Sequence, residues 1–244
     1  FLFEDVDIRD GSIDVRYPLT APPDPTSRFL SEPGPEGRGF VRVIGFQGID
    51  GHVDGVVVAD PAVGGLTMNV RDFAFEGRIL QDLVQVDNLD GSIVWSGDRI
   101  SVAVETVGLL GATATGSGAV DLGDGDQVEF TFDGVVESLD LSELRWLEPR
   151  LPDARASARI GVEYGSEGLR ATWSDGQLPI DGGNIEGEGT VRVVQGGETS
   201  FEDVTLAVLG VPVSTLEEFI PLVLPLEGRL SGTVELSGTM DAMR

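Results

Sequence analysis

The stretch Val6–Ile13 (VDIRDGSI) indicates the fold, because it returns almost unchanged at Val86–Ile93 (VDNLDGSI). A third Asp-Gly pair, Asp50-Gly51, falls midway between the two copies, and Asp181-Gly182 follows later. Asp-Gly between alternating apolar runs is a strong signal for a β-hairpin, since glycine accepts the positive φ of a tight turn. The sequence therefore predicts repeated strand–turn–strand units that must stack on one another to bury their apolar faces.

Alternation between apolar and polar residues is the second feature of the chain. Phe130 and Phe132 alternate with Thr131 and Asp133, and the run 156–164 follows the same rule. A period of two places apolar side chains on one face of a β-sheet and polar side chains on the other. We therefore expect a mostly antiparallel β protein with one hydrophobic sheet face, and a compact β-sandwich is the alternative architecture.

The composition is strongly acidic, with 16 basic residues against 42 acidic ones and a formal charge of −26. This balance excludes nucleic-acid binding, which relies on basic side chains to displace counterions from phosphates. It also argues against adsorption to anionic membrane surfaces. Because hydrophobic residues make up 41% of the chain, it is too apolar to be disordered. We interpret the acidic residues as a solvated outer face.

Several reactive residue types are absent. Every basic residue is Arg, there is no Cys, and His52 is the only histidine. The chain therefore lacks a P-loop lysine, a Schiff-base lysine and a thiol nucleophile, as well as the His and Cys ligands of an ordinary zinc site. We expect no catalytic residues, no metal site and no cofactor, and we interpret His52 as a turn residue.

The chain is organised as one repetitive domain, residues 1–244, broken by a few irregular segments. The interval 18–39 holds six of the thirteen prolines and reads as a long loop. Short helices are expected at about 139–148, where leucines recur before Pro149, and at about 214–223, where Ser214-x-x-Glu217 forms a capping box. Because it begins at Phe1 rather than Met, we expect the chain to be a fragment of a longer protein.

Recurrent small-residue motifs relate the chain to a known family. These are the repeated Asp-Gly-Ser-Ile stretches, Gly116–Val120 (GSGAV), Gly187–Val191 (GEGTV) and the closing run Leu224–Thr239 (LPLEGRLSGTVELSGT). Together they resemble the AsmA-like family of diderm bacteria. The resemblance implies an elongated, twisted antiparallel β-sheet that curls into a hydrophobic groove.

The resemblance also implies a function and a location. The expected role is phospholipid transport between the inner and outer membranes, or outer-membrane assembly, without enzymatic activity. The protein would lie in the periplasm, anchored to the inner membrane through a segment absent from this chain. Its expected partners are phospholipid acyl chains and membrane proteins at either end of the groove.

The residues expected to line such a groove lie on the apolar phase of the strands. Packing in an ordinary core is the alternative for each of them. They are Ile100, Val102, Val104, Val128, Phe130, Phe132, Ile160, Val162, Val204 and Leu206.

Two other functional classes stay open on the residues alone. Glycosidases need only two carboxylates, so the acidic chain is compatible with a carbohydrate-active β enzyme. Gly123–Asp126 (GDGD) is an acidic, glycine-rich turn of the kind that ligates calcium, which would suit a calcium-stiffened adhesin module. The motif occurs once, and an ordinary turn is the simpler interpretation. Gly187-x-Gly189 lacks the third glycine of a dinucleotide-binding motif.

Overall fold

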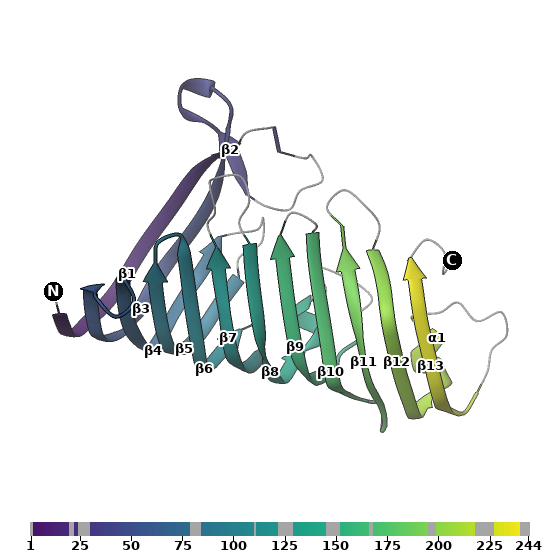
Figure 1. Ribbon diagram of the computed structural model, residues 1–244. Helices are drawn as coiled ribbons and strands as arrows, with labels where there is room; N and C mark the ends of the chain where they lie inside the picture. The colour runs from purple at the N-terminus through teal and green to yellow at the C-terminus, as the bar shows by residue number, and fades with distance from the viewer. Residues whose placement is uncertain are drawn as a thin grey trace. The chain divides into compact units, whose positions relative to one another are not determined.

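The structure is a computed structural model that describes residues 2–19, 22–23, 30–78, 84–109, 111–121, 129–144, 152–165, 168–194, 199–217 and 227–239. The described residues are almost entirely β-strand (Figure 1). In chain order the elements are β1 (Leu2–Leu19), β2 (Ser31–Pro33), η1 (Pro35–Gly37), β3 (Phe40–Asp60), β4 (Gly65–Arg78), β5 (Val84–Ser96), β6 (Arg99–Leu109), β7 (Ala112–Asp121), β8 (Glu129–Asp140), η2 (Leu141–Leu144), β9 (Arg155–Gly165), β10 (Gly168–Ile180), β11 (Gly183–Val193), β12 (Thr199–Pro212), α1 (Val213–Glu217) and β13 (Arg229–Thr239).

The strands form one large sheet that is not closed. Their order is β1-β3-β4-β5-β6-β7-β8-β9-β10-β11-β12-β13, and β2 pairs with β3 outside this path. Every strand pair whose register is described is antiparallel. The mostly β, antiparallel class predicted from the alternation is therefore confirmed.

The chain divides into two compact units, which are described separately below. The first unit comprises Phe1–Leu110 with Thr115–Glu129, and the second comprises Gly111–Ala114 with Phe130–Arg244. The first thus contains β1 to β6, and the second contains β8 to β13 apart from Glu129.

The Asp-Gly pairs do not form the hairpin turns that the sequence predicts. Asp10-Gly11 lies inside β1, Asp50-Gly51 inside β3 and Asp90-Gly91 inside β5; only Asp181-Gly182 sits in a turn, between β10 and β11. Asp10 has a φ of 50°, and the pairing of β1 with β3 shifts register around Gly11. These are β-bulges, in which an extra residue bends a strand without ending it. The prediction was wrong at Asp10 because a bulge can use the same positive φ as a tight turn. Asp50 and Asp90 have no positive φ and instead accept a hydrogen bond from a bulged residue of the neighbouring strand.

The bulges keep one face of the sheet apolar. Without an extra residue, apolar side chains would change face wherever their spacing shifts from two to three. In β4 the apolar residues Leu66, Met68 and Val70 are followed by Phe73 and Phe75, and the bulged Asp72 between them has a φ of 48°. The Phe73 ring lies over the backbone of Gly51, on the same side of the sheet as Val53 and Val70.

A repeated hydrogen bond fixes these bulges and accounts for their aspartates. The backbone N–H of Asp10 donates to Oδ1 of Asp50 at 3.1 Å, and the N–H of Asp72 donates to Oδ1 of Asp90 at 2.8 Å. In each case the donor has a positive φ and the acceptor belongs to an Asp-Gly pair of the next strand. The aspartate therefore satisfies a backbone donor that the bulge removes from the ladder.

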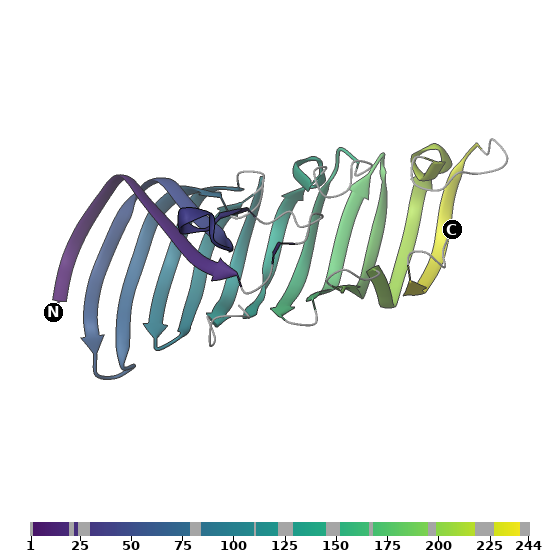
Figure 2. The ribbon, with the colours of Figure 1, turned by 90° about the horizontal axis from the view of Figure 1, so that it is seen from above.

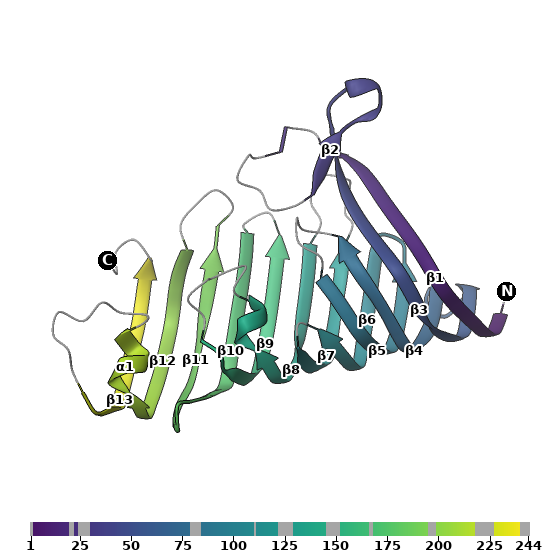
Figure 3. The same cartoon turned by 180° about the vertical axis from the view of Figure 1, so that it is seen from behind.

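Buried residues are few, and several of them lie on the apolar face. In the first unit they include Ile49, Val53, Val70 and Val86, with Val70 only 2% exposed. In the second unit Ile180, Val208 and Val211 form a cluster against which Ala154 and Ile185 pack. The short helix α1 lies beside β12 near this cluster (Figure 3).

The expected helices are only partly present. Residues 139–140 end β8 and Leu141–Leu144 form a 3₁₀ turn; residues 145–148 lie outside the described ranges. Helix α1 covers Val213–Glu217, so Ser214 lies inside its first turn rather than at the cap; residues 218–223 lie outside the described ranges. The prediction of two helices is thus not confirmed. No helix in the described ranges has the length and hydrophobicity that crossing a bilayer requires.

The predicted loop 18–39 is also partly ordered. Pro18 and Leu19 extend β1, β2 and η1 follow from Ser31, and residues 20–21 and 24–29 lie outside the described ranges. Pairing of β2 with β3 outside the main strand order gives Pro33 an edge position, where proline is tolerated in a sheet.

Candidate functional site

Apolar side chains of the first unit stand in rows across the strands. Val6, Val53, Val70, Gly91 and Val104 oppose one another in register from β1 to β6. Two parallel rows lie further along β4, β5 and β6 on the same face. They contain Met68, Ile93 and Val102, and Leu66, Trp95 and Ile100.

The second unit repeats this arrangement. Phe132, Val162, Ala171, Val191 and Phe201 oppose one another in register across β8, β9, β10, β11 and β12. Because cross-strand partners point to the same side of a sheet, the row forms a continuous apolar stripe. The stripe runs perpendicular to the strands and stays within one unit.

A neighbouring row of the second unit is shaped by a glycine. Ile160 opposes Trp173, which opposes Gly189. A Cβ on Gly189 would meet the Trp173 ring at 2.9 Å and Val204 Cγ2 at 2.6 Å. The glycine therefore leaves the space that the indole occupies, and Val204 shares the face of Ile160 and Trp173.

The structure places nine of the ten expected lining residues on these apolar faces, and Val128 lies outside the described residues. Three belong to the first unit and six to the second. Val204 is buried at 3% exposure. The other eight are partly exposed, namely Ile100, Val102, Val104, Phe130, Phe132, Ile160, Val162 and Leu206.

A charged cluster lies on the opposite face of the first unit. Asp7, His52 and Arg71 oppose one another across β1, β3 and β4, and Asp5 opposes Asp54. These residues alternate along their strands with the apolar row of Val6, Val53 and Val70. Period-two geometry therefore puts them on the polar side.

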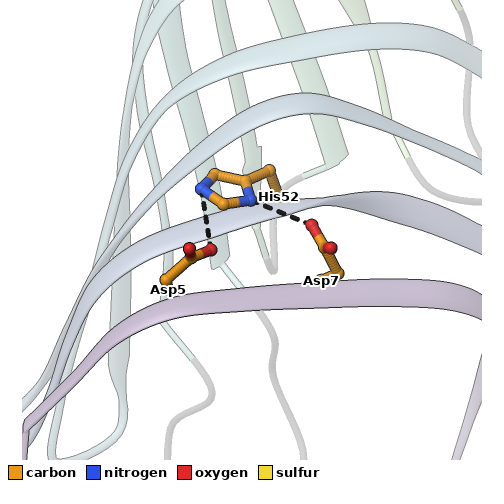
Figure 4. Close-up of side chains that lie close together, drawn as sticks. All are labelled: Asp5, Asp7 and His52. Atoms are coloured by element: carbon orange, nitrogen blue, oxygen red, sulfur yellow. Dashed lines mark hydrogen bonds and ion pairs between the residues drawn. The ribbon is translucent and has the colours of Figure 1, made fainter.

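Both nitrogens of His52 face carboxylates (Figure 4). Nδ1 lies 3.1 Å from Asp7 Oδ1, whereas Nε2 lies 2.8 Å from Asp54 Oδ1 and 3.3 Å from Asp5 Oδ1. Asp54 also forms an ion pair with Arg71. The hydrogen bonds with Asp7 and Asp54 raise the pKa of His52, and the hydrogen bond with His52 lowers the pKa of Asp7.

The interpretation of His52 as a turn residue was wrong, because it lies within β3. A signal was available in the sequence: Asp5 and Asp7 flank Val6, and His52 and Asp54 flank Val53. Alternation alone predicts that each pair shares a strand face. Asp7 and His52 are 45 residues apart in the sequence, and neither segment alone predicts that they pair.

The remaining motifs give no further site within the described residues. Gly123–Asp126, the calcium motif considered above, lies outside them. Gly187-x-Gly189 lies inside β11, where both glycines make room for side chains or backbone of β12. Comparisons with protein families, with curated proteins and with solved structures find no match for this chain.

Proposed function

We propose that the apolar sheet faces bind phospholipid acyl chains, and that the chain is part of a hydrophobic conduit for phospholipid between the inner and outer membranes of a diderm bacterium. The observation that carries this proposal is the stripe from Phe132 to Phe201, together with the partial exposure of Phe132 and Val162. In an ordinary core, a continuous row of large apolar side chains would be mostly buried. A partly exposed, continuous apolar stripe instead suits a ligand that completes the burial.

The dimensions of the stripe support an elongated apolar ligand. Five strands about 4.8 Å apart give a stripe about 19 Å long, which is comparable with an extended acyl chain. Each methylene removed from water contributes about 0.8 kcal/mol, so a whole acyl chain gains on the order of 10 kcal/mol. A continuous stripe keeps this gain nearly constant as the acyl chain moves along it. Direction would come from the lipid gradient or from a partner protein.

The bending of the strands supports a concave binding face. In the first unit β1 curves along its length (Figure 2), and its bulge lies between Ile8 and Ile13. Val70 and Val53, the most buried hydrophobic residues of this unit, lie on the apolar face. In a single sheet, side chains on the inner side of a bend shield one another from water. We infer that the apolar face is the inner surface of a groove.

The proposal is tested by photo-crosslinking at two adjacent residues. A photoreactive phenylalanine analogue replaces Phe132 on the apolar face or Thr131 on the exposed polar face. The protein is expressed in a diderm host, irradiated and analysed for covalently bound phospholipid by mass spectrometry. We expect lipid adducts at position 132 and none at 131. Absence of adducts at 132, or equal adducts at both positions, would contradict the proposal.

A further inference from the structure

We propose that one end of the strands of the first unit docks on the surface of a phospholipid bilayer whose headgroups are zwitterionic. The docking surface, called here the strand-end patch, consists of Leu2, Phe3, Val58 and Trp95. Among its described residues the first unit exposes five large hydrophobic side chains, and only the fifth, Ile13, lies elsewhere, further along β1. The patch is separate from the proposed acyl-binding stripe, which belongs to the second unit.

The register of the strands brings the patch together. Leu2 of β1 opposes Val57, the residue before Val58 in β3. Across β4, the partners of Val57 and of Trp95 are consecutive residues. Leu2 and Trp95 are therefore three strand spacings apart, about 14 Å, and Val58 comes from a strand between them. Four exposed apolar side chains at one level of neighbouring strands form a patch rather than scattered exceptions.

The patch is apolar on both faces of the sheet. Consecutive residues of a strand point to opposite faces, and Leu2 and Phe3 are 59% and 52% exposed. Leu2 shares the face of Val6, whereas Phe3 shares the polar face of Asp5. In β3 the run 56–58 consists of three valines, so the alternation is lost there as well. Because packing on a core requires apolar residues on one face only, these strand ends suit an environment that receives both faces.

The area of the patch favours a bilayer over a protein partner. Phe3 and Trp95 are about half exposed and offer about 100 Å² each, so the four side chains together offer at most about 400 Å². A stable protein–protein interface buries about 800 Å² on each partner, which is more than the patch supplies for a second copy of this chain. Binding to a bilayer interface scales with the apolar area inserted and needs no complementary shape.

Trp95 is suited to leave water. Its Nε1–H donates to the carbonyl oxygen of Gly97 at 2.8 Å, so the only polar hydrogen of the side chain already has a partner. The indole can therefore enter an apolar environment without the cost of an unpaired donor. Tryptophan is also a residue type that is enriched at membrane–water interfaces.

The charges around the patch select the headgroup. Glu4 follows Phe3, and Asp98 lies in the turn after Trp95; both carboxylates are exposed. The nearby Arg99 forms an ion pair with Asp121 at 3.4 Å, and the whole chain has a formal charge of −26. An anionic bilayer would repel these carboxylates, whereas a zwitterionic one would not. The same carboxylates stay in water and limit insertion to the side chains of the patch.

The test is flotation of the whole chain with phosphatidylcholine vesicles. We expect the parent chain to bind, and Phe3→Ser and Trp95→Ser each to lower the bound-to-free ratio about tenfold or more, as the loss of about 100 Å² of apolar contact implies. Ile13→Ser is the matched control, because Ile13 is 55% exposed on the same strand as Phe3; it should bind like the parent chain. Phosphatidylglycerol, which is anionic, should weaken binding when it is added to the vesicles. Circular dichroism checks the fold of each variant.

Three results would overturn the proposal. The first is a parent chain that does not float, or an Ile13→Ser variant that loses as much binding as Phe3→Ser. The second is stronger binding to the anionic vesicles, because basic groups would then drive it. The third is self-association in sedimentation velocity without vesicles that Phe3→Ser abolishes, which would assign the patch to a second copy. None of these results changes the lipid adducts expected at Phe132, so failure of docking and failure of acyl-chain binding are distinguished.

Discussion

At the scale of single residues, His52 stands out because both of its ring nitrogens contact carboxylates. Its ring is held by Asp7 of β1 and Asp54 of its own strand, and Asp54 in turn pairs with Arg71 of β4. These side chains join three strands on the solvent side of the sheet. Their interactions depend on protonation, so they give the first unit a pH-dependent stability.

The pH dependence can be predicted in sign. The pKa of His52 is raised above 6.5 in the folded state, so its contribution to stability is fully present below pH 6.5 and is lost as the pH rises through the folded pKa. We expect the melting temperature of the parent chain to approach that of His52→Asn as the pH increases from 6 to 9. NMR titration of the ring gives the pKa directly. A ring that titrates at or below 6.5 would contradict the contacts described.

Asp7 acts in the opposite direction. Its pKa is lowered below 3.8 in the folded state by the hydrogen bond with His52, so its contribution is present above pH 3.8 and lost as the pH falls through the folded value. The two side chains therefore stabilise the fold together only between these limits.

Close packing at Gly189 gives a second prediction at this scale. Gly189→Ala would force a Cβ against Trp173 and Val204, and overpacking of this kind typically costs about 1–3 kcal/mol. Gly232→Ala in β13 is the matched control, since nothing lies within 4 Å of the added Cβ. Urea unfolding measures both variants. Equal stabilities of the two would show that Trp173 does not lie over Gly189.

At the scale of elements, the bulge is the device that shapes the strands. Each one lengthens a strand by a residue, bends it and returns the apolar side chains to the same face. Four aspartates inside strands have a positive φ, namely Asp10, Asp72, Asp175 and Asp203. Bulges therefore occur in both units. The repeated Asp-Gly pairs at Asp10 and Asp90 belong to bulged strands and not to hairpin turns.

The side chain of Asp90 tests this device. Asp90→Ala removes the acceptor of the Asp72 N–H, and loss of such a bond costs about 1 kcal/mol. Asp90→Asn keeps a carbonyl oxygen at the same place and should lose much less. Hydrogen exchange of the Asp72 amide reports the bond itself, and we expect faster exchange only in the alanine variant. Unchanged exchange there would show that the aspartate does not hold the bulge.

At the scale of the whole molecule, the central question is whether the apolar faces are a core or a binding surface. The two possibilities assign different roles to residues that share one face. Val204, at 3% exposure, is buried by the protein itself, whereas Phe130 and Ile160 are partly exposed. A charge at a buried position has no access to water and should unfold a marginally stable domain. A charge at a groove position can reach water.

We therefore predict opposite outcomes for three charged variants. Phe130→Asp and Ile160→Asp should stay folded, and Val204→Asp should unfold. A charge placed in an apolar path costs about 2.5–3.5 kcal/mol, so the first two should retain about 100-fold less co-purified phospholipid. Thr131→Asp on the exposed polar face controls for added charge. Unfolding of Phe130→Asp and Ile160→Asp would identify both residues as core, and normal lipid content in folded variants would refute the conduit.

The sequence by itself determined the β class, the two unlike faces and the positions of most apolar rows. These follow from period-two alternation, which is a local property of each strand. Some Asp-Gly pairs also coincide with a positive φ, as at Asp10, Asp175 and Asp181, but Asp72 and Asp203 have a positive φ without a following glycine. Nine of the predicted lining residues accordingly lie on the apolar faces, in the units to which they belong.

Only the tertiary structure decided whether each Asp-Gly bends a strand or ends it, and which residues meet across strands. A bulge needs a neighbouring strand to pair on both sides of it, and Asp50 holds Asp10 from 40 residues away. The same holds for His52, whose nearest carboxylates come partly from a strand 45 residues earlier. Register is fixed by the burial of a whole face and by the bulges together, so no short segment contains it.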